Sequence, residues 1–303
     1  GWDGYPDTRC GKMDAETCGL AAALEYPNVE LVTGAHVTGL KAGPDGKRIA
    51  EVVYRKDGAE ERLSPRVVAL CAGAVQSAAL LLRSGLANGS DQVGRCFMNH
   101  NATAVIAIDP RFRNDAVYQK TFGLNDWYLS DGNGGPPLGN VQLLGRVVPD
   151  ILKIQVPSLP RPLARWISGH AIDLYLISED LPDPESRVVL NGNDIQLIWR
   201  RSNMTAHRRL LAKTKETLKA AGFPVVLSRL FDGRVPSHQC GTLRIGSDPS
   251  ASVLDPDCRS WDHPNLFVTD AGALPTSAAV NPALTVAALA LRAAETVKKE
   301  LAA

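Results

Sequence analysis

Two short, mainly apolar runs constrain the fold of this chain more than any other feature. Residues 67–72 read Val-Val-Ala-Leu-Cys-Ala and are followed by Gly73 and a helical pattern over 76–83. Residues 265–270 read Asn-Leu-Phe-Val-Thr-Asp and are followed by the small residues Ala-Gly-Ala. A continuously apolar strand is typical of a sheet buried on both faces, and the strand–glycine–helix order is typical of a doubly wound parallel sheet. The sequence therefore predicts part of a doubly wound α/β domain.

Most other segments carry the alternating patterns and turn residues of antiparallel strands. The dipeptide Asn191-Gly192, the strongest hairpin signal in the chain, separates alternating runs at 187–190 and 195–199. We expect the middle third of the chain to form an antiparallel sheet. The other expected elements are a helix over 12–26, strands over 29–33, 36–40, 48–55, 61–63, 102–109, 141–144 and 172–177, and an amphipathic helix over 205–221.

The length and these patterns together predict two domains that are interleaved in the sequence. A chain of 303 residues suits roughly two domains. We expect residues 12–100 and 255–303 to form the α/β domain. We expect residues 101–254 to form a second domain built on the antiparallel sheet.

Charge and cysteine spacing exclude several classes of function. The formal net charge is +1, and no run of five like charges occurs, so neither nucleic acid nor an anionic membrane surface is an expected partner. The longest apolar run, near 283–291, is too short to span a bilayer. The six cysteines form no Cys-x-x-Cys pair, and no Cys/His spacing indicates a metal site, so we expect no metal. The scattered cysteines favour a reducing, cytoplasmic compartment.

One histidine and one asparagine are the candidates for chemistry on an alcohol. His238 lies in a loop of small residues, Gln-Cys-Gly-Thr, which lets another chemical group approach closely. An imidazole can accept the hydroxyl proton of an alcohol as a hydride leaves, and Asn281 can donate to the same oxygen without titrating. Two plainer interpretations stay open. A lone histidine is more often structural, and Asn281-Pro282 also suits the start of a core helix.

These residues lie in segments that closely resemble the C-terminal part of the glucose-methanol-choline (GMC) flavoenzymes. The most specific matches are His238-x-x-Gly241-Thr242 and Asn281-Pro282-x-x-Thr285. Further similar segments lie at 27–37, 67–85, 93–100 and 244–276. Within the family the chain looks most like the pyranose-oxidase-like, sugar-oxidising branch, on the basis of residues 3–6 and 181–188.

The resemblance implies an FAD-dependent oxidoreductase that oxidises an alcohol group of a sugar or glycoside. Hydride would pass to flavin N5, His238 would take the hydroxyl proton, and Asn281 would align the oxygen. The α/β domain would bind FAD, and the antiparallel-sheet domain would bind substrate. The residues implied to contact FAD are Val37, Ala72, Asp270, Ala271 and Pro282.

Two of these expectations also have a physical basis and a plainer alternative. The residues after Pro282 are apolar on nearly every face, so we expect a buried helix whose positive N-terminal end faces a reduced flavin. Asp270 ends a buried strand, where it would hold a ribityl hydroxyl or backbone amides. It would equally serve as a turn-forming Asp before a glycine.

One family feature is missing. No Gly-x-Gly-x-x-Gly occurs in the chain, which removes the pyrophosphate-binding turn and disfavours a nicotinamide enzyme as well. We therefore expect the flavin site to need an N-terminal segment or a second chain. The alternative is a truncated, non-catalytic fragment or subunit of such an enzyme that binds a partner chain.

Overall fold

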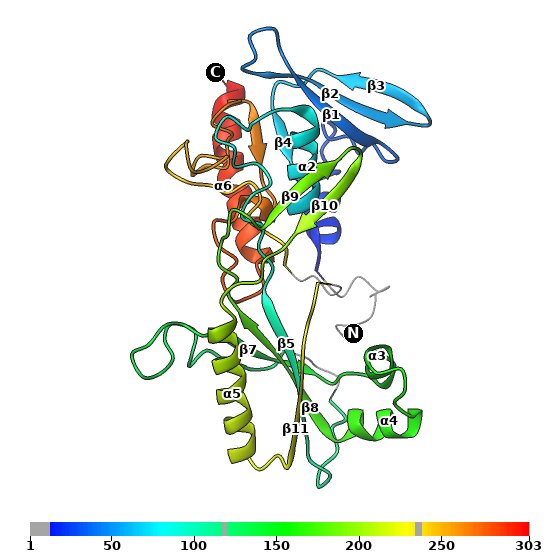
Figure 1. Ribbon diagram of the computed structural model, residues 1–303. Coiled ribbons are helices and arrows are strands. Elements are labelled where there is room, and N and C mark those ends of the chain that lie inside the picture. Colours follow the sequence, from blue (N-terminus) through cyan, green and yellow to red (C-terminus); the bar gives the residue numbers. More distant parts are fainter. Residues whose placement is uncertain (1–12, 117–119, 234–237, 303) are drawn as a thin grey trace. The chain divides into compact units, whose positions relative to one another are not determined.

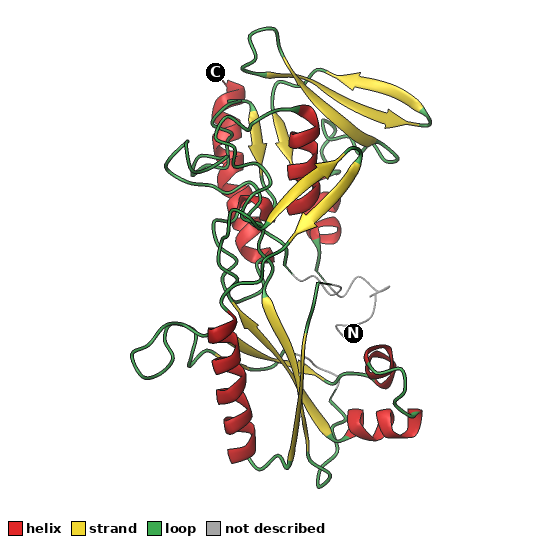
Figure 2. Ribbon diagram, in the orientation of Figure 1, coloured by secondary structure: helices red, strands yellow, loops and turns green. Residues whose placement is uncertain are grey.

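The computed structural model describes residues 13–116, 120–233 and 238–302, and these form two compact units (Figure 1). Unit 1 comprises the described residues of Gly1–Thr33, Ala102–Ile177 and Thr205–Phe231. Unit 2 comprises the described residues of Gly34–Asn101, Ser178–Met204 and Asp232–Ala303. Unit 2 combines three small sheets with two longer helices, whereas one large antiparallel sheet dominates unit 1 (Figure 2).

The two apolar runs do form a parallel pair at the centre of unit 2. Strand β4 (Val68–Leu70) pairs in parallel with β12 (Leu266–Val268), which is completely buried. Helix α2 (Ala74–Ser84) follows β4 after Gly73, whose φ of 83° favours glycine. The core around them contains Leu81 and Phe267, each fully buried, and each such side chain contributes roughly 2–3 kcal/mol. The predicted α/β fold is confirmed, with strands shorter than the apolar runs suggested.

Unit 2 also carries two small antiparallel sheets. Strands β1 (His36–Ala42), β2 (Ile49–Lys56) and β3 (Ala59–Leu63) form the predicted meander. Strands β9 (Arg187–Asn191) and β10 (Asp194–Ile198) form the hairpin expected at Asn191-Gly192. The hairpin was predicted correctly but its location was not. It forms its own two-stranded sheet beside α2 in unit 2 instead of joining the larger antiparallel sheet.

Unit 1 is built on a five-stranded sheet in the order β11-β5-β8-β7-β6. Helix α5 packs on one face, where its buried Leu210 joins the apolar core formed by the strands. Helices α3 and α4 lie by the other face (Figure 1). The bounds are β5 (Asn101–Ile108), β6 (Gly123–Leu124), β7 (Asn140–Gly145), α3 (Pro149–Gln155), α4 (Arg161–Gly169), β8 (Ala171–Ser178), α5 (Met204–Ala220) and β11 (Val225–Leu230).

Three expectations about local structure differ from what the structure shows. The helix expected over 12–26 forms only over 15–23, mainly as η1 (Glu16–Leu20) and α1 (Ala21–Ala23), and the strand expected over 29–33 does not form. In both segments the apolar side chains are exposed, so burial does not reinforce the local propensity. Helix α6 (Ala283–Ala302) forms where expected, yet its first half is exposed: Leu284 is 83% accessible and Leu291 72%.

The division into units also differs in detail from the predicted domain boundaries. Residues 178–204 and the described residues of 232–254 lie in unit 2, although the sequence patterns grouped them with the antiparallel sheet. The loop that carries His238 is therefore in the same unit as Asn281.

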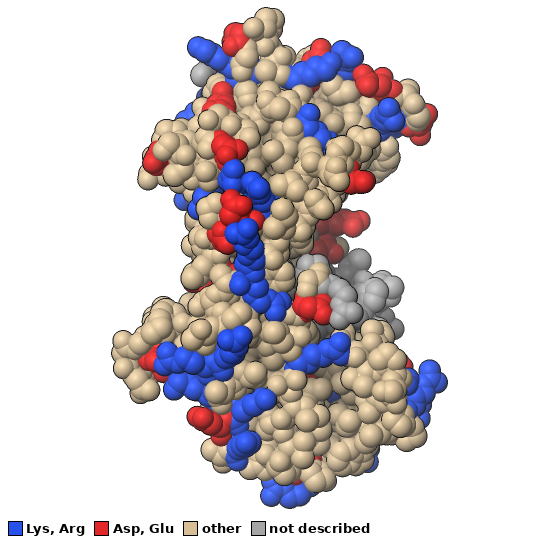
Figure 3. Space-filling model, viewed as in Figure 1, with Lys and Arg blue, Asp and Glu red and all other residues tan. Residues whose placement is uncertain are grey.

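Basic and acidic side chains occur together on the face shown in Figure 3, most of which is uncharged.

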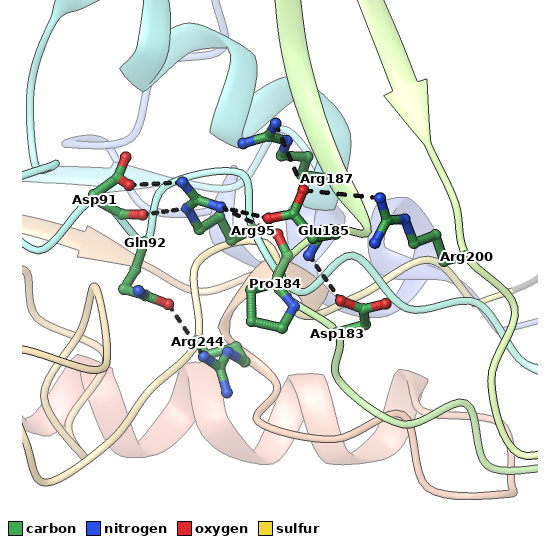
Figure 4. Close-up of polar contacts among 9 residues, drawn as sticks. All are labelled: Asp91, Gln92, Arg95, Asp183, Pro184, Glu185, Arg187, Arg200 and Arg244. Atoms are coloured by element: carbon green, nitrogen blue, oxygen red, sulfur yellow. Dashed lines mark hydrogen bonds and ion pairs between the residues drawn. The ribbon is translucent and has the colours of Figure 1, made fainter.

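An ion cluster fixes the 181–188 segment in unit 2 (Figure 4). The carboxylate of Glu185 lies 3.5 Å from Arg95, 3.8 Å from Arg187 and 4.0 Å from Arg200. Arg95 also pairs with Asp91 at 2.6 Å. These side chains are partly exposed, so each pair contributes little by itself, and the cluster serves mainly to hold two loops together.

Candidate active site

The loop that carries His238 is held by a close backbone contact in unit 2. Met98 and Cys240 form a two-way antiparallel bridge, with N–H···O distances of 2.9 and 3.0 Å. Gly241 has a φ of 90°, and a Cβ there would lie 2.5 Å from the carbonyl oxygen of Cys96. The small residue is thus required by packing as well as by conformation. His238 itself has a φ of 61°, a left-handed backbone conformation that is uncommon outside glycine and clusters at functional sites.

The structure brings His238 and Asn281 together. Asn281 directly precedes Pro282 and helix α6, and its Nδ2 lies 3.3 Å from Nε2 of His238. Because an amide nitrogen only donates hydrogen bonds, Nε2 of His238 is the acceptor in this contact. The pair thus presents an unprotonated imidazole nitrogen beside an amide N–H group. That combination can receive a proton from an alcohol while it orients the oxygen.

A third residue of this cluster, His100, was not among the predicted site residues. Its side chain is 2% exposed, and its Nδ1 lies 2.9 Å from Nδ1 of His238. Its Nε2 lies 2.7 Å from the carbonyl oxygen of Ser277. Burial lowers the pKa of His100, which favours its neutral form. The only sequence signal was its position at the end of the 93–100 segment, and nothing in one sequence indicates that this segment meets His238.

Cys240 lies beside this cluster but contributes no charge. Its thiol is buried in an apolar group that includes Met98 and Leu274. Burial raises the pKa of the Cys240 thiol to about 12, so it stays protonated at neutral pH. Its role is packing under the loop.

Asp270 acts on the protein backbone. Its carboxylate accepts hydrogen bonds from the amide N–H of Gly73 at 2.9 Å, the amide N–H of Gly272 at 2.7 Å, and the hydroxyl of Ser77 at 2.5 Å. The side chain is 8% exposed. It therefore ties the turn after β4 to the turn after β12, as the backbone-amide alternative expected. Its contact with FAD remains a prediction.

Of the other predicted FAD contacts, Ala72 and Ala271 lie in the same turns, whereas Pro282 begins helix α6. The N–H of Ala72 donates to the hydroxyl of Ser77, and the carbonyl of Ala271 accepts from Gly241. Pro282 accepts from Val286 in the first turn of α6. Val37 lies apart on β1, where it pairs with Tyr54 of β2 and is 40% exposed. These roles too remain predictions.

The described residues give no sign of a metal centre or a membrane span. Among them, no three His, Cys, Asp or Glu side chains are grouped so that they could ligate a metal ion. None of the helices in the described ranges combines the length and apolar character that crossing a bilayer requires.

Family models match this chain over two long segments. The model of the N-terminal part of the GMC oxidoreductases matches residues 2–102, and the model of their C-terminal part matches residues 182–290. The chain belongs to the GMC oxidoreductase family. Members of this family are FAD-dependent flavoenzymes that act on CH–OH groups, so FAD is the cofactor of this family site.

Several curated proteins are similar to this GMC chain. It is 30% identical to C-glycoside 3-oxidase of Arthrobacter globiformis, over 91% of this chain and 54% of the relative. It is 25% identical to the fructose dehydrogenase large subunit of Gluconobacter japonicus, over 93% and 57%. It is 26% identical to 6'''-hydroxyparomomycin C oxidase of Streptomyces lividus, over 96% and 56%. The chain spans about half the length of these relatives.

Solved structures share the GMC fold with this chain. Pyridoxine 4-oxidase from Mesorbium loti superposes with a TM-score of 0.61 at 23% identity, over 91% of this chain and 59% of that one. A formate oxidase superposes with a TM-score of 0.63 at 16% identity, over 90% and 61%. The predicted GMC-like architecture is confirmed.

The residues present fit one side of a flavin site. Cys71 and Ala72 are exposed at the C-terminal end of β4, where ligands bind in parallel α/β sheets. The turn after β12 lies next to them, because Asp270 binds both turns. In this arrangement the turns at 71–73 and 271–273 would hold FAD, with the His238–Asn281 pair in the same unit.

Proposed function

We propose that this chain takes part in the FAD-dependent oxidation of an alcohol group of a sugar or glycoside. The proposal is supported by the relatives, which include a C-glycoside oxidase, a fructose dehydrogenase subunit and an aminoglycoside oxidase. The single observation that carries it is the 3.3 Å contact between Nε2 of His238 and Nδ2 of Asn281. This contact supports the proposal that a proton acceptor and a neutral donor act on one hydroxyl group.

In this mechanism His238 and Asn281 have distinct tasks. FAD, when bound, supplies the hydride acceptor. The substrate hydroxyl lies against both side chains and takes the place of the Asn281 amide as the partner of Nε2 of His238, which accepts the hydroxyl proton as the C–H bond breaks. Nδ2 of Asn281 donates a hydrogen bond to the same oxygen and holds it in place while the carbonyl forms. Asn281 stays neutral throughout, so it does not compete with His238 for the proton.

The experiment is anaerobic flavin reduction by a panel of sugars and glycosides, followed through the visible absorbance of the FAD-loaded protein. His238→Ala should lower the reduction rate by about 10²- to 10⁴-fold, the contribution of a general base, with flavin still bound. His170→Ala is the matched control, because His170 lies in unit 1, where its Nδ1 contacts the carbonyl oxygen of Trp166 and its ring stacks on the Trp166 ring. An unchanged reduction rate in His238→Ala refutes the assignment.

We also propose that further polypeptide, an N-terminal segment or a second chain, completes the flavin site. The exposed leucines on the first half of α6 support this, since Leu284 and Leu291 are large apolar side chains on a helix next to the site. The missing glycine fingerprint also supports it.

The scattered free cysteines of the described residues support a reducing, cytoplasmic setting.

The same exposed face of α6 favours a second candidate function, a non-catalytic subunit that binds a partner chain. The absorbance spectrum of the purified protein separates the two. A yellow protein whose colour bleaches with sugar supports the enzyme. A colourless protein that FAD does not bind, and that forms a defined complex with another chain in sedimentation, supports the subunit.

A further inference from the structure

Three side chains and one carbonyl group form an unbroken row in unit 2. Nδ2 of Asn281 lies 3.3 Å from Nε2 of His238, and Nδ1 of His238 lies 2.9 Å from Nδ1 of His100. Nε2 of His100 then lies 2.7 Å from the carbonyl oxygen of Ser277. A histidine nitrogen can donate or accept according to its tautomer, so the direction of each bond has to be worked out from the two ends of the row.

Both ends of the row indicate the same direction of hydrogen bonding. The amide nitrogen of Asn281 can only donate, so Nε2 of His238 accepts and carries no proton. The carbonyl oxygen of Ser277 can only accept, so Nε2 of His100 carries a proton and donates it. A neutral imidazole has one proton, which leaves Nδ1 of His100 as an acceptor and Nδ1 of His238 as a donor. The three bonds therefore run in one direction, from Asn281 to Ser277.

The far end of the row is rigid. Ser277 is 2% exposed, and its hydroxyl donates to the carbonyl oxygen of Asp180 and accepts from the Asp180 amide. Asp180 is itself buried, and its carboxylate accepts from Asn99, Trp199 and Ser202. The carbonyl of Ser277 is thus held at a fixed point.

The surroundings keep His100 neutral. Burial is the largest influence on the pKa of His100 and lowers it, against smaller opposing effects of the hydrogen bond to the Ser277 carbonyl and of the Asp180 charge. The carboxylate of Asp180 faces Asn99, Trp199 and Ser202 instead of the ring. Cys240, on the neighbouring loop, is a neutral thiol.

We propose that His100 is a positioning residue that selects the tautomer of His238. It accepts the Nδ1 proton of His238 and so keeps the opposite nitrogen, Nε2, unprotonated and directed at Asn281 and the substrate oxygen. This inference rests on the proposed function, in which Nε2 of His238 takes the substrate proton. It adds that the reactive nitrogen is chosen by the backbone carbonyl of Ser277, acting through His100.

The row also suits the charged state of His238. When Nε2 takes the hydroxyl proton, both nitrogens of His238 become donors, and the Nδ1–H bond to His100 is preserved. That bond becomes charge-assisted and therefore stronger. His100 gains no proton in this step, because Nδ1 of His238 keeps its proton and Nε2–H of His100 continues to donate to the carbonyl oxygen of Ser277. The proton and the hydride thus leave the substrate for His238 and FAD respectively, and His100 ends unchanged.

The first test reads the tautomers directly and needs no turnover. In the FAD-loaded protein labelled with ¹⁵N-histidine, long-range ¹H–¹⁵N correlation spectra should show His238 protonated at Nδ1 and His100 protonated at Nε2. His238→Ala and His100→Asn assign the two signals. A spectrum with His238 protonated at Nε2, or His100 at Nδ1, overturns the proposal.

The second test compares two substitutions of His100 by flavin-reduction rate. His100→Phe keeps a ring but removes the acceptor, and should slow reduction about 10- to 100-fold, the loss of one hydrogen bond to a charged group. His100→Asn places its Oδ1 near the lost Nδ1 and should recover much of that rate. A purely structural role would give two variants that differ in stability but reduce flavin equally fast once folded.

A control variant, together with the combined results for His238 and His100, distinguishes failure of tautomer selection from failure of the proposed function. His263→Asn is the matched control, because His263 is also a buried histidine of unit 2 with two backbone partners, Ala87 and Lys47, and its folded form should reduce flavin at the normal rate. If His238→Ala is slow while both His100 variants react normally, tautomer selection fails and the proposed function stands. If His238→Ala itself reacts normally, the proposed function fails.

Discussion

The close backbone contact at Gly241 gives a sharp prediction about stability. In Gly241→Ala the new Cβ would lie 2.3 Å from Cε of Met98 and 2.5 Å from the carbonyl oxygen of Cys96, at a φ of +90°. The methionine end can move, but the carbonyl belongs to the backbone and cannot move without breaking the bridge that holds the loop.

The expected loss is the sum of two effects. A left-handed backbone costs an alanine about 1–2 kcal/mol. Overpacking against a fixed carbonyl adds about 1–3 kcal/mol. Gly241→Ala should therefore lower the free energy of unfolding of unit 2 by about 2–5 kcal/mol.

Two control glycines separate the effects. Gly46 has a φ of +69° and no atom within 4 Å of its added Cβ, so Gly46→Ala measures the conformational cost alone. Gly169 has neither a positive φ nor a close neighbour, and its alanine variant should stay within about 0.5 kcal/mol of the parent. Guanidinium unfolding followed by circular dichroism gives all three values. If Gly241→Ala costs no more than Gly46→Ala, the close contact is not real and the account of the loop is wrong.

Two further predictions concern buried carboxylates. Asp270→Asn places an NH₂ group against an N–H or O–H donor. It should lower the free energy of unfolding by about 1–3 kcal/mol, measured by the same guanidinium unfolding. Asp126 is exposed, so the control Asp126→Asn should change the free energy of unfolding little. Burial raises the pKa of Asp173, in the 610 Å³ apolar cavity between the sheet and helices α3 and α4, from 3.8 to about 7. Folding therefore takes up a proton, so this contribution to stability is full below about pH 4 and is lost as the pH rises through 7, by roughly 4 kcal/mol in total. Asp173→Asn keeps an acceptor for the Val147 amide and should be more stable than the parent at pH 8 but not at pH 4; equal stability of the two proteins at both pH values contradicts the reasoning.

The sequence predicted the elements whose local signals agree with their burial. The strand–glycine–helix order around Gly73 and the hairpin at Asn191-Gly192 formed as expected, because turn chemistry and apolar pattern specify the same structure. The predicted strand over 29–33 did not form, and its apolar side chains stay substantially exposed, so burial does not favour a strand there. The sequence did not predict which sheet the hairpin belongs to. Strand pairing depends on tertiary contacts, and an alternating pattern of apolar residues does not specify them.

The residues of the candidate site could also be predicted only in part from the sequence. His238 and Asn281 carry sequence patterns of their own, and the structure brings them into contact. His100 has no such pattern, because its place beside His238 depends on the bridge between Met98 and Cys240, far apart in the sequence. The burial predicted for α6 relied on composition alone, which cannot say whether another surface covers the helix.

Chemical rescue of His238→Ala tests the central claim most directly. The FAD-loaded variant is mixed anaerobically with a sugar that reduces the parent protein, and flavin reduction is timed with and without added imidazole. Imidazole supplies the missing proton acceptor. If His238 is the base, added imidazole should therefore raise the rate of flavin reduction in the variant until the rate saturates, and should not change the rate of the parent. A variant that reduces flavin at the parent's rate without imidazole would contradict the assignment of His238 as the base.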